Sequence, residues 1–235
     1  MNAPHDIVFL FDVDDTLLDN DAINADLDAH IERVFGAAGH KLYREIYESL
    51  RGEVQYADYL GAIQRFRVQC GDEVRAQDLG AYLLEYPFAE RLYPRALEAI
   101  AHVSRFGPAV VLSDGDAVLQ PRKISTSGIA DAVGGRVLIY VHKETMLDDV
   151  ERRFPARRYV IVEDKLRVLD ALKQHWRERL ATVFVRQGHY AHDPAVVAKY
   201  PPAQIALESI GELCRCALED FLNPTQPAMT ARGQP

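Results

Sequence analysis

Three carboxylates stand within four positions near the start of the chain, where the sequence reads FDVDDT. Asp12, Asp14 and Asp15 follow directly on the apolar run at 7–11, and Thr16 comes next. Carboxylates that crowd together repel one another, so one of them takes up a proton unless a cation lies between them. Mg²⁺ prefers oxygen ligands and typically takes one or two protein carboxylates together with substrate phosphate. The stretch therefore predicts a magnesium site, beside which a carboxylate could attack phosphorus.

Other residues that could take part in this chemistry follow later apolar runs. Ser113 and Asp114 end the run at 109–112, Lys143 lies just after the run at 136–141, and Glu163-Asp164 end the run at 159–162. A hydroxyl and an ammonium can hold phosphoryl oxygens, and the ammonium can neutralise the charge that develops there. A second carboxyl near the first can protonate the leaving oxygen and then deprotonate the attacking water, which is typically worth ~10²- to 10⁴-fold.

Short apolar segments must position these side chains. They are four to six residues long, rich in β-branched residues and apolar on both faces, as in strands of a covered parallel sheet. They lie at 7–11, 109–112, 136–141, 159–162 and 182–185, with a weaker one at 204–207. Helical patterns separate them, which predicts an α/β fold with a doubly wound, Rossmann-like parallel sheet. The carboxyl ends of such strands meet at one edge of the sheet, so we expect the polar residues to converge there.

One long gap interrupts the strand–helix alternation. Residues 18–92 contain no convincing strand and read as several helices, so we expect an α-helical cap domain inserted into a core of residues 1–17 and 93–222. Residues 223–235 are rich in proline and polar residues, which predicts a disordered tail.

Charge and composition limit the partners. The net charge of −8 disfavours nucleic acid and anionic lipid, and no apolar run approaches the ~20 residues that span a bilayer. Three cysteines form neither a disulfide framework nor a zinc pattern. We therefore expect a cytoplasmic monomer or homodimer that binds a small molecule, with no nucleic-acid or membrane partner.

The four motifs together resemble those of the haloacid dehalogenase superfamily, in its phosphatase type with an α-helical cap inserted after the first motif. The family begins with an apolar strand and Asp-x-Asp-x-Thr, which matches Asp12-Val13-Asp14-Asp15-Thr16. Its second motif is a Ser or Thr after the next core strand, its third a Lys, and its fourth an acidic pair. Ser113, Lys143 and Glu163-Asp164 occupy these places in the same order.

The resemblance implies a role for each of these residues. Asp12 would be the nucleophile and Asp14 the general acid/base. Asp12, the backbone carbonyl of Asp14 and Asp164 would hold Mg²⁺, with Glu163 nearby. The phosphate-binding and substrate-binding residues would be Thr16, Ser113, Asp114 and Lys143.

The sequence departs from the family pattern at three places. Asp15 stands where many relatives have Gly, and Glu144 follows Lys143 where Pro is common. A further carboxylate often follows the acidic pair by four or five residues, but those places hold Val168 and Leu169. The metal site would then depend more on Glu163.

Several alternatives stay open at this point. Lys123 and Lys165 compete with Lys143 for the third motif, but Lys123 falls in a helical pattern and Lys143 is preferred. After the fifth apolar run, Arg186, His189 and His192 could touch substrate.

The sequence predicts a magnesium-dependent phosphohydrolase that acts on a small phosphorylated metabolite through an aspartyl phosphate. A phosphomutase or a catalytically weak binding protein could share the fold, as could a haloacid dehalogenase, although the second carboxyl argues against that one. A phospho-receiver domain places its phosphorylated Asp after an interior strand and has no helical insert.

Overall fold

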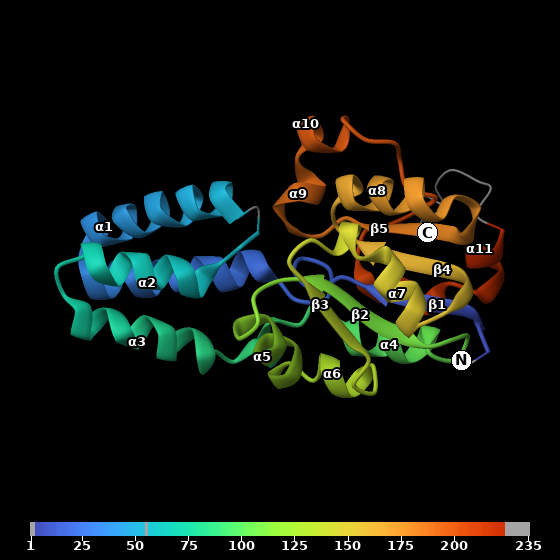
Figure 1. Cartoon of the computed structure of the whole chain (residues 1–235), viewed down its shortest axis with the longest axis horizontal. Coiled ribbons are helices and arrows are strands. Elements are labelled where there is room, and N and C mark those ends of the chain that lie inside the picture. The colour runs from blue at the N-terminus through green and yellow to red at the C-terminus, as the bar shows by residue number, and fades with distance from the viewer. Residues whose placement is uncertain (1–2, 55, 224–235) are drawn as a thin grey trace, which may run out of the picture.

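The computed structural model describes residues 3–54 and 56–223, which form a six-stranded parallel sheet with a helical insert beyond one edge (Figure 1). The strands are β1 His5–Phe11, β2 Ala109–Asp114, β3 Val137–Tyr140, β4 Ala156–Glu163, β5 Leu180–Val185 and β6 Ile205–Leu207. Their order is β3-β2-β1-β4-β5-β6, and every neighbouring pair is parallel. The predicted α/β fold is confirmed, and a strand forms at each of the six apolar runs, although β3 and β6 are shorter than the runs at 136–141 and 204–207. The chain crosses from one half of the sheet to the other beside β1, which is where such folds bind ligands.

Helices cover both faces of the sheet because the strands are apolar on both sides. Phe9 and Phe11 of β1 pack on one cluster, whereas Val8 and Leu10 pack on another. The first cluster draws on α4 Ala96–Val103, α5 Leu119–Thr126, α6 Ile129–Ala132, η4 Ile210–Arg215 and α11 Leu218–Leu222. The second draws on α7 Leu147–Arg153 and α8 Leu166–Trp176. Two covered faces leave the carboxyl edge of the strands as the place where polar side chains gather.

The insert has a hydrophobic core of its own. It consists of α1 Asn20–Val54, α2 Tyr59–Gln69 and α3 Glu73–Leu84. α1 is interrupted at Gly36, whose φ of 70° and ψ of 178° suit glycine better than any residue with a side chain. Rings of Tyr47 and Tyr59 stack at 5.3 Å inside this core. We call this insert the cap.

Two passages of chain join the cap to the sheet, and they lie side by side. Asp19 N donates to Arg91 O at 2.8 Å, and Tyr93 N donates to Leu17 O at 2.9 Å. The returning passage contains the short helix η1 Phe88–Arg91. The cap is therefore held to the core by paired backbone at its base, a few residues from Asp12.

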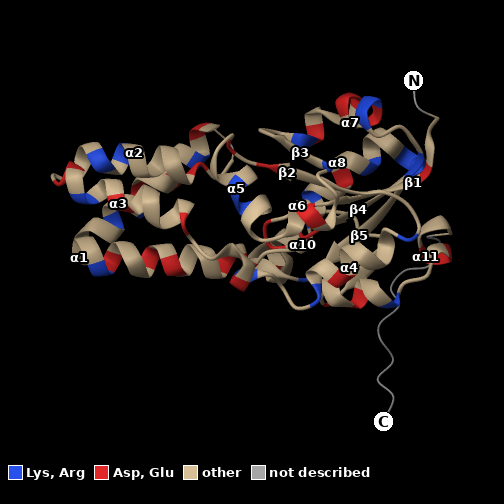
Figure 2. Ribbon diagram, turned by 90° about the horizontal axis from the view of Figure 1, so that it is seen from below, with Lys and Arg blue, Asp and Glu red and all other residues tan. Residues whose placement is uncertain are grey.

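The remaining elements are short. They are η2 Lys143–Thr145, η3 Arg177–Arg179, α9 Gly188–His192 and α10 Pro194–Val197. Charged residues of both signs occur along α1 (Figure 2), where Arg44 and Glu48 pair at 3.1 Å. None of the described helices is both long and apolar enough to cross a bilayer. The expected disordered tail lies, from residue 224 on, outside the described residues.

Candidate active site

Asp12 lies at the carboxyl end of β1, where the backbone turns away from the sheet. Its N–H still donates to Val162 O at 3.0 Å, so its position is fixed by the neighbouring strand. The amides of Leu17 and Leu18 then both donate to Val13 O at 2.9 Å, which closes a tight turn. The side chain of Asp12 is buried, with Thr16 Oγ1 at 3.5 Å from its Oδ2.

Lys143 is the cation that reaches Asp12. Its Nζ lies 2.5 Å from Asp12 Oδ1 and 2.7 Å from Glu163 Oε2, and it donates to Leu112 O at 3.3 Å. Its backbone N–H donates to Asp114 Oδ1 at 2.6 Å, which anchors η2 to the end of β2. The structure thus brings the preferred lysine, rather than Lys123, to the first carboxylate of the motif.

The two residues of the acidic pair at the end of β4, Glu163 and Asp164, lie in different environments. Burial would raise the pKa of Glu163, but Lys143 and Lys165 outweigh it and lower that pKa to about 2. Glu163 also accepts from the Lys165 N–H at 3.1 Å. Asp164 is equally buried, yet within the described chain neither of its carboxylate oxygens has a hydrogen-bond donor.

Burial is also the main cause that raises the pKa of Asp164 well above its usual range, with Glu163 and Asp12 adding to it. The nearest ammonium, Lys165 Nζ, lies 3.7 Å from Asp164 Oδ1, which is beyond hydrogen-bond distance. The pKa of Asp12 is raised to about 7, mainly because the carboxyl is buried and in addition because the charge of Glu163 lies nearby. Carboxylate oxygens of Asp12, Glu163 and Asp164 lie within 4.8 Å of one another. We call these three residues the inner acidic group.

Asp14 is held separately from this group. Lys123 Nζ lies 2.7 Å from its Oδ1, and Gln120 Nε2 donates to its Oδ2 at 3.4 Å. Gln120 also donates to Ser113 Oγ at 2.9 Å. Sequence reasoning weighed Lys123 only as a candidate for the third motif and did not single out Gln120, because a lysine and a glutamine in a helical pattern carry no signal of where they point.

A cavity of about 710 Å³ joins these side chains to the cap. Its core wall includes the two aspartates of the first motif, the end of β2, Lys143 and the acidic pair, namely Asp12, Asp14, Ser113, Asp114, Lys143, Glu163 and Asp164. Its cap wall includes Asn24, Arg51 and Tyr56. Thr16 is fully buried behind Asp12 and is not among the lining residues. A ligand in this cavity would touch both the core and the cap.

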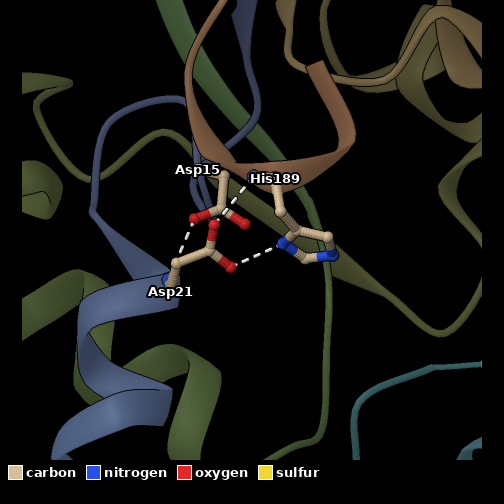
Figure 3. A group of neighbouring side chains, drawn as sticks. All are labelled: Asp15, Asp21 and His189. Atoms are coloured by element: carbon tan, nitrogen blue, oxygen red, sulfur yellow. Dashed lines mark hydrogen bonds and ion pairs between the residues drawn. The ribbon is translucent and has the colours of Figure 1, made fainter. Parts of the chain in front are cut away.

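A second acidic group lies at the entrance to α1 (Figure 3). It contains Asp15, Asp21 and His189, whose possible ligand atoms also lie within 4.8 Å of one another. Asp15 has a φ of 62°, which explains why glycine suits this place in relatives, and its Oδ1 accepts from the N–H groups of Asn20 and Asp21 at 3.0 and 3.1 Å. We call these three residues the outer acidic group.

Of the three residues after β5 that could touch substrate, only His189 lines the cavity. Its N–H and Nδ1 lie 2.7 and 2.6 Å from the carboxylate oxygens of Asp21, so it joins the core to the first turn of the cap. Arg186 pairs with Glu208 at 3.7 Å instead, and His192 is exposed on α9.

The comparisons with known proteins agree with this architecture. No protein-family model matches the chain, and neither does any curated protein. Among solved structures, a haloacid dehalogenase-like hydrolase of Burkholderia xenovorans is 56% identical, with a TM-score of 0.87, over 91% of this chain and 100% of that chain. The chain belongs to the haloacid dehalogenase superfamily of hydrolases.

More distant structures share the superfamily fold. The HAD-hydrolase YfnB of Bacillus subtilis, bound to magnesium, is 16% identical with a TM-score of 0.58, over 90% of this chain and 98% of that chain. The L-2-haloacid dehalogenase of Xanthobacter autotrophicus is 16% identical with a TM-score of 0.57, over 88% of this chain and 96% of that chain. At this identity the likeness extends to the fold alone.

Proposed function

We propose that the chain is a magnesium-dependent phosphohydrolase that acts on a small phosphorylated metabolite through an aspartyl phosphate on Asp12. The observation that carries this proposal is the second carboxyl, Asp14, which lines the same cavity as Asp12 and is held by its own cation. A dehalogenase attacks carbon and has no use for an acid at this place.

The residues present fit a magnesium ion. The two oxygens of Asp164 are buried without a donor, beside a second carboxyl whose pKa is raised, and such a cluster calls for positive charge. Asp12 and Asp164 would hold the ion, together with the backbone carbonyl of Asp14 that the family resemblance implies. Both oxygens of Glu163 are already engaged, Oε2 by Lys143 Nζ at 2.7 Å and Oε1 by the Lys165 N–H at 3.1 Å, so Glu163 serves to orient the Lys143 ammonium. When bound, Mg²⁺ supplies positive charge to the phosphoryl oxygens.

The residues of the chain then divide the reaction between them. A carboxylate oxygen of Asp12 bonds to phosphorus while the bond to the leaving oxygen breaks, and Asp14 gives that oxygen its proton. Asp14 next takes a proton from the water whose oxygen bonds to phosphorus, the bond between Asp12 and phosphorus breaks, and inorganic phosphate leaves with Asp12 restored as a carboxylate. Lys143 and the Ser113 hydroxyl hold the phosphoryl oxygens.

Replacement of Asp12 by Asn tests this proposal most directly. We expect phosphate release from 4-nitrophenyl phosphate to fall at least about 10³-fold, because the amide is a poor nucleophile. EDTA should silence the wild-type enzyme and Mg²⁺ should restore it. The matched control is Asp6→Asn, since Asp6 is exposed at the far end of β1.

Two outcomes would overturn the proposal. Wild-type turnover by Asp12→Asn, with unchanged circular dichroism, would remove Asp12 as nucleophile. Activity that is indifferent to EDTA, together with chloride release from 2-chloropropionate, would establish the dehalogenase alternative instead.

A further inference from the structure

We propose that Lys123 is a positioning residue that holds the Asp14 carboxyl in its working orientation and makes this orientation depend on the cap. The inference rests on the proposed function, because it concerns proton transfer by Asp14. The family motifs assign no role to this lysine, which lies in α5, after the second motif in the chain.

Lys123 is a buried cation, with 1% of its surface exposed. Its Nζ lies 2.7 Å from Asp14 Oδ1 and 3.0 Å from Asn20 Oδ1. Removing an ammonium from water costs several kcal/mol, and a well-packed apolar residue of similar volume often gives equal or greater stability. Methionine would fill the same space, so packing alone does not account for a charge here.

A second residue of α5 holds the other oxygen of the same carboxyl. Gln120 lies three residues before Lys123, on the same face of the helix, and its Nε2 is 3.4 Å from Asp14 Oδ2. One helix face thus contacts both oxygens and limits rotation of the carboxyl. The amide of Gln120 also reaches Ser113 Oγ at 2.9 Å, which relates the orientation of the acid to the predicted phosphate-binding hydroxyl.

Two further groups beside the Lys123 ammonium belong to the cap. Asn20 is the first residue of α1, and its Nδ2 donates to the hydroxyl of Tyr59 in α2 at 3.2 Å. The ring of Tyr59 also faces the ammonium, with 5.9 Å from Nζ to the ring centroid. The contacts of Lys123 therefore stay complete only while the cap holds this position over the core.

This arrangement has a defined chemical consequence. General acid catalysis needs the donor within about 2.6–3.2 Å of the leaving oxygen, and a misplacement of about 1 Å can cost ~10²-fold. In kcat/KM, which reports the steps up to the departure of the leaving group, only substrates whose leaving group needs the proton should show a loss. 4-Nitrophenolate leaves readily without one, whereas phenolate, which is nearly the same size, depends far more on it.

The test is Lys123→Met, assayed with phenyl phosphate and 4-nitrophenyl phosphate in the presence of Mg²⁺. We expect kcat/KM to fall at least about 10-fold for phenyl phosphate and at most about 3-fold for 4-nitrophenyl phosphate. The turnover number kcat also contains the hydrolysis of the aspartyl phosphate, in which Asp14 takes the proton of the attacking water, so it should fall for both substrates and the two are compared by kcat/KM. The matched control, Lys41→Met on the exposed side of α1, should leave both substrates unaffected.

Further variants keep the inference testable if Lys123→Met folds poorly. Gln120→Met should discriminate between the two substrates in the same direction. Tyr59→Phe removes the hydroxyl that accepts from Asn20 and should show a smaller loss, about 2- to 5-fold, again confined to phenyl phosphate. Unfolding midpoints in urea are measured beside each assay.

Equal losses of kcat/KM on both substrates, or none, would overturn the positioning role of Lys123. Discrimination by Lys123→Met without any by Tyr59→Phe would overturn the dependence on the cap. Failure of the proposed function itself looks different, because the wild-type enzyme would then release no phosphate from either compound with Mg²⁺ present.

Discussion

The inner and outer acidic groups place similar ligand atoms equally close together, yet their surroundings differ. In the outer group, Asp15 and Asp21 accept hydrogen bonds from backbone amides and from His189. In the inner group, Asp164 receives no such bond within the described chain. Acidic residues in a cluster are therefore not sufficient to indicate a cation site. A buried carboxylate without donors is the stronger indication, because the fold leaves its charge to be matched by something else.

The two groups also differ in what they do for stability. Hydrogen bonds to backbone amides at the start of α1 stabilise the cap entrance, much as an N-cap residue does. The inner group has more buried carboxylates than close ammonium groups, which costs free energy of folding when no cation is bound. Such costs are typical of sites kept for function.

The largest expected contrast comes from Asp164→Asn. We expect turnover of 4-nitrophenyl phosphate to fall about 10²-fold or more, since charge at the phosphoryl oxygens is worth several kcal/mol. In EDTA the variant should be more stable than wild type by about 1–3 kcal/mol, because the amide brings no buried charge and its NH2 group can donate to the neighbouring carboxylates. Urea unfolding with and without Mg²⁺ measures both effects, with Asp6→Asn as control.

The pH dependence of this contrast has a definite sign. The pKa of Asp164 is raised in the folded protein, so the folded state binds its proton more tightly than the unfolded chain does. Stability therefore declines as pH rises from the unfolded pKa of about 4 through the raised one, and levels off above it. The stability advantage of Asp164→Asn in EDTA should grow over this interval. If Mg²⁺ raised the unfolding midpoint of Asp164→Asn as much as that of wild type, Asp164 would not be a ligand.

A smaller effect, on stability rather than turnover, is expected from Asp15. Asp15→Ala removes the acceptor for two amides but keeps a side chain at a φ of 62°, so we expect a loss of about 1–2 kcal/mol. Asp15→Gly should recover about 1 kcal/mol of that loss, because glycine adopts this φ without strain. Urea unfolding measures the difference between the two variants. An equal loss in both would mean that the backbone strain at this position is negligible.

The two acidic groups also show which features of the site could be predicted from the sequence alone. Strand ends could be predicted because apolar runs are local, and the parallel sheet then brought Asp12, Ser113, Lys143 and Glu163-Asp164 together. The role of Lys123 could not be predicted, because it depends on which way α5 faces. It also depends on the contact with the start of the cap, which lies about a hundred residues earlier in the chain. The left-handed backbone of Asp15 was visible only as a departure from glycine. Which cap side chains line the cavity depends on the break of α1 at Gly36, which no pattern of apolar residues reveals.

The smallest effect concerns the exposed edge of the outer group. His189→Ala removes the imidazole contact with Asp21 and keeps the backbone N–H bond to the same carboxylate. The side chain of His189 is 56% exposed and that of Asp21 is 36% exposed. Exposed pairs of this kind contribute about 0.2–1 kcal/mol, so the unfolding free energy should fall by no more than that. His192→Ala is the matched control on the same short helix, where the imidazole is exposed.

The ionic strength then separates a structural contact from a substrate contact at His189. At 1 M salt the screening length falls to about 3 Å, so any ionic part of the His189–Asp21 contact should weaken and the stability difference from wild type should shrink. The KM for 4-nitrophenyl phosphate should stay within about 2-fold of wild type, since the imidazole is already engaged by Asp21. A KM that rose 10-fold, with stability unchanged, would instead place His189 on the substrate and would end the distinction between an inner group that does chemistry and an outer group that holds the cap.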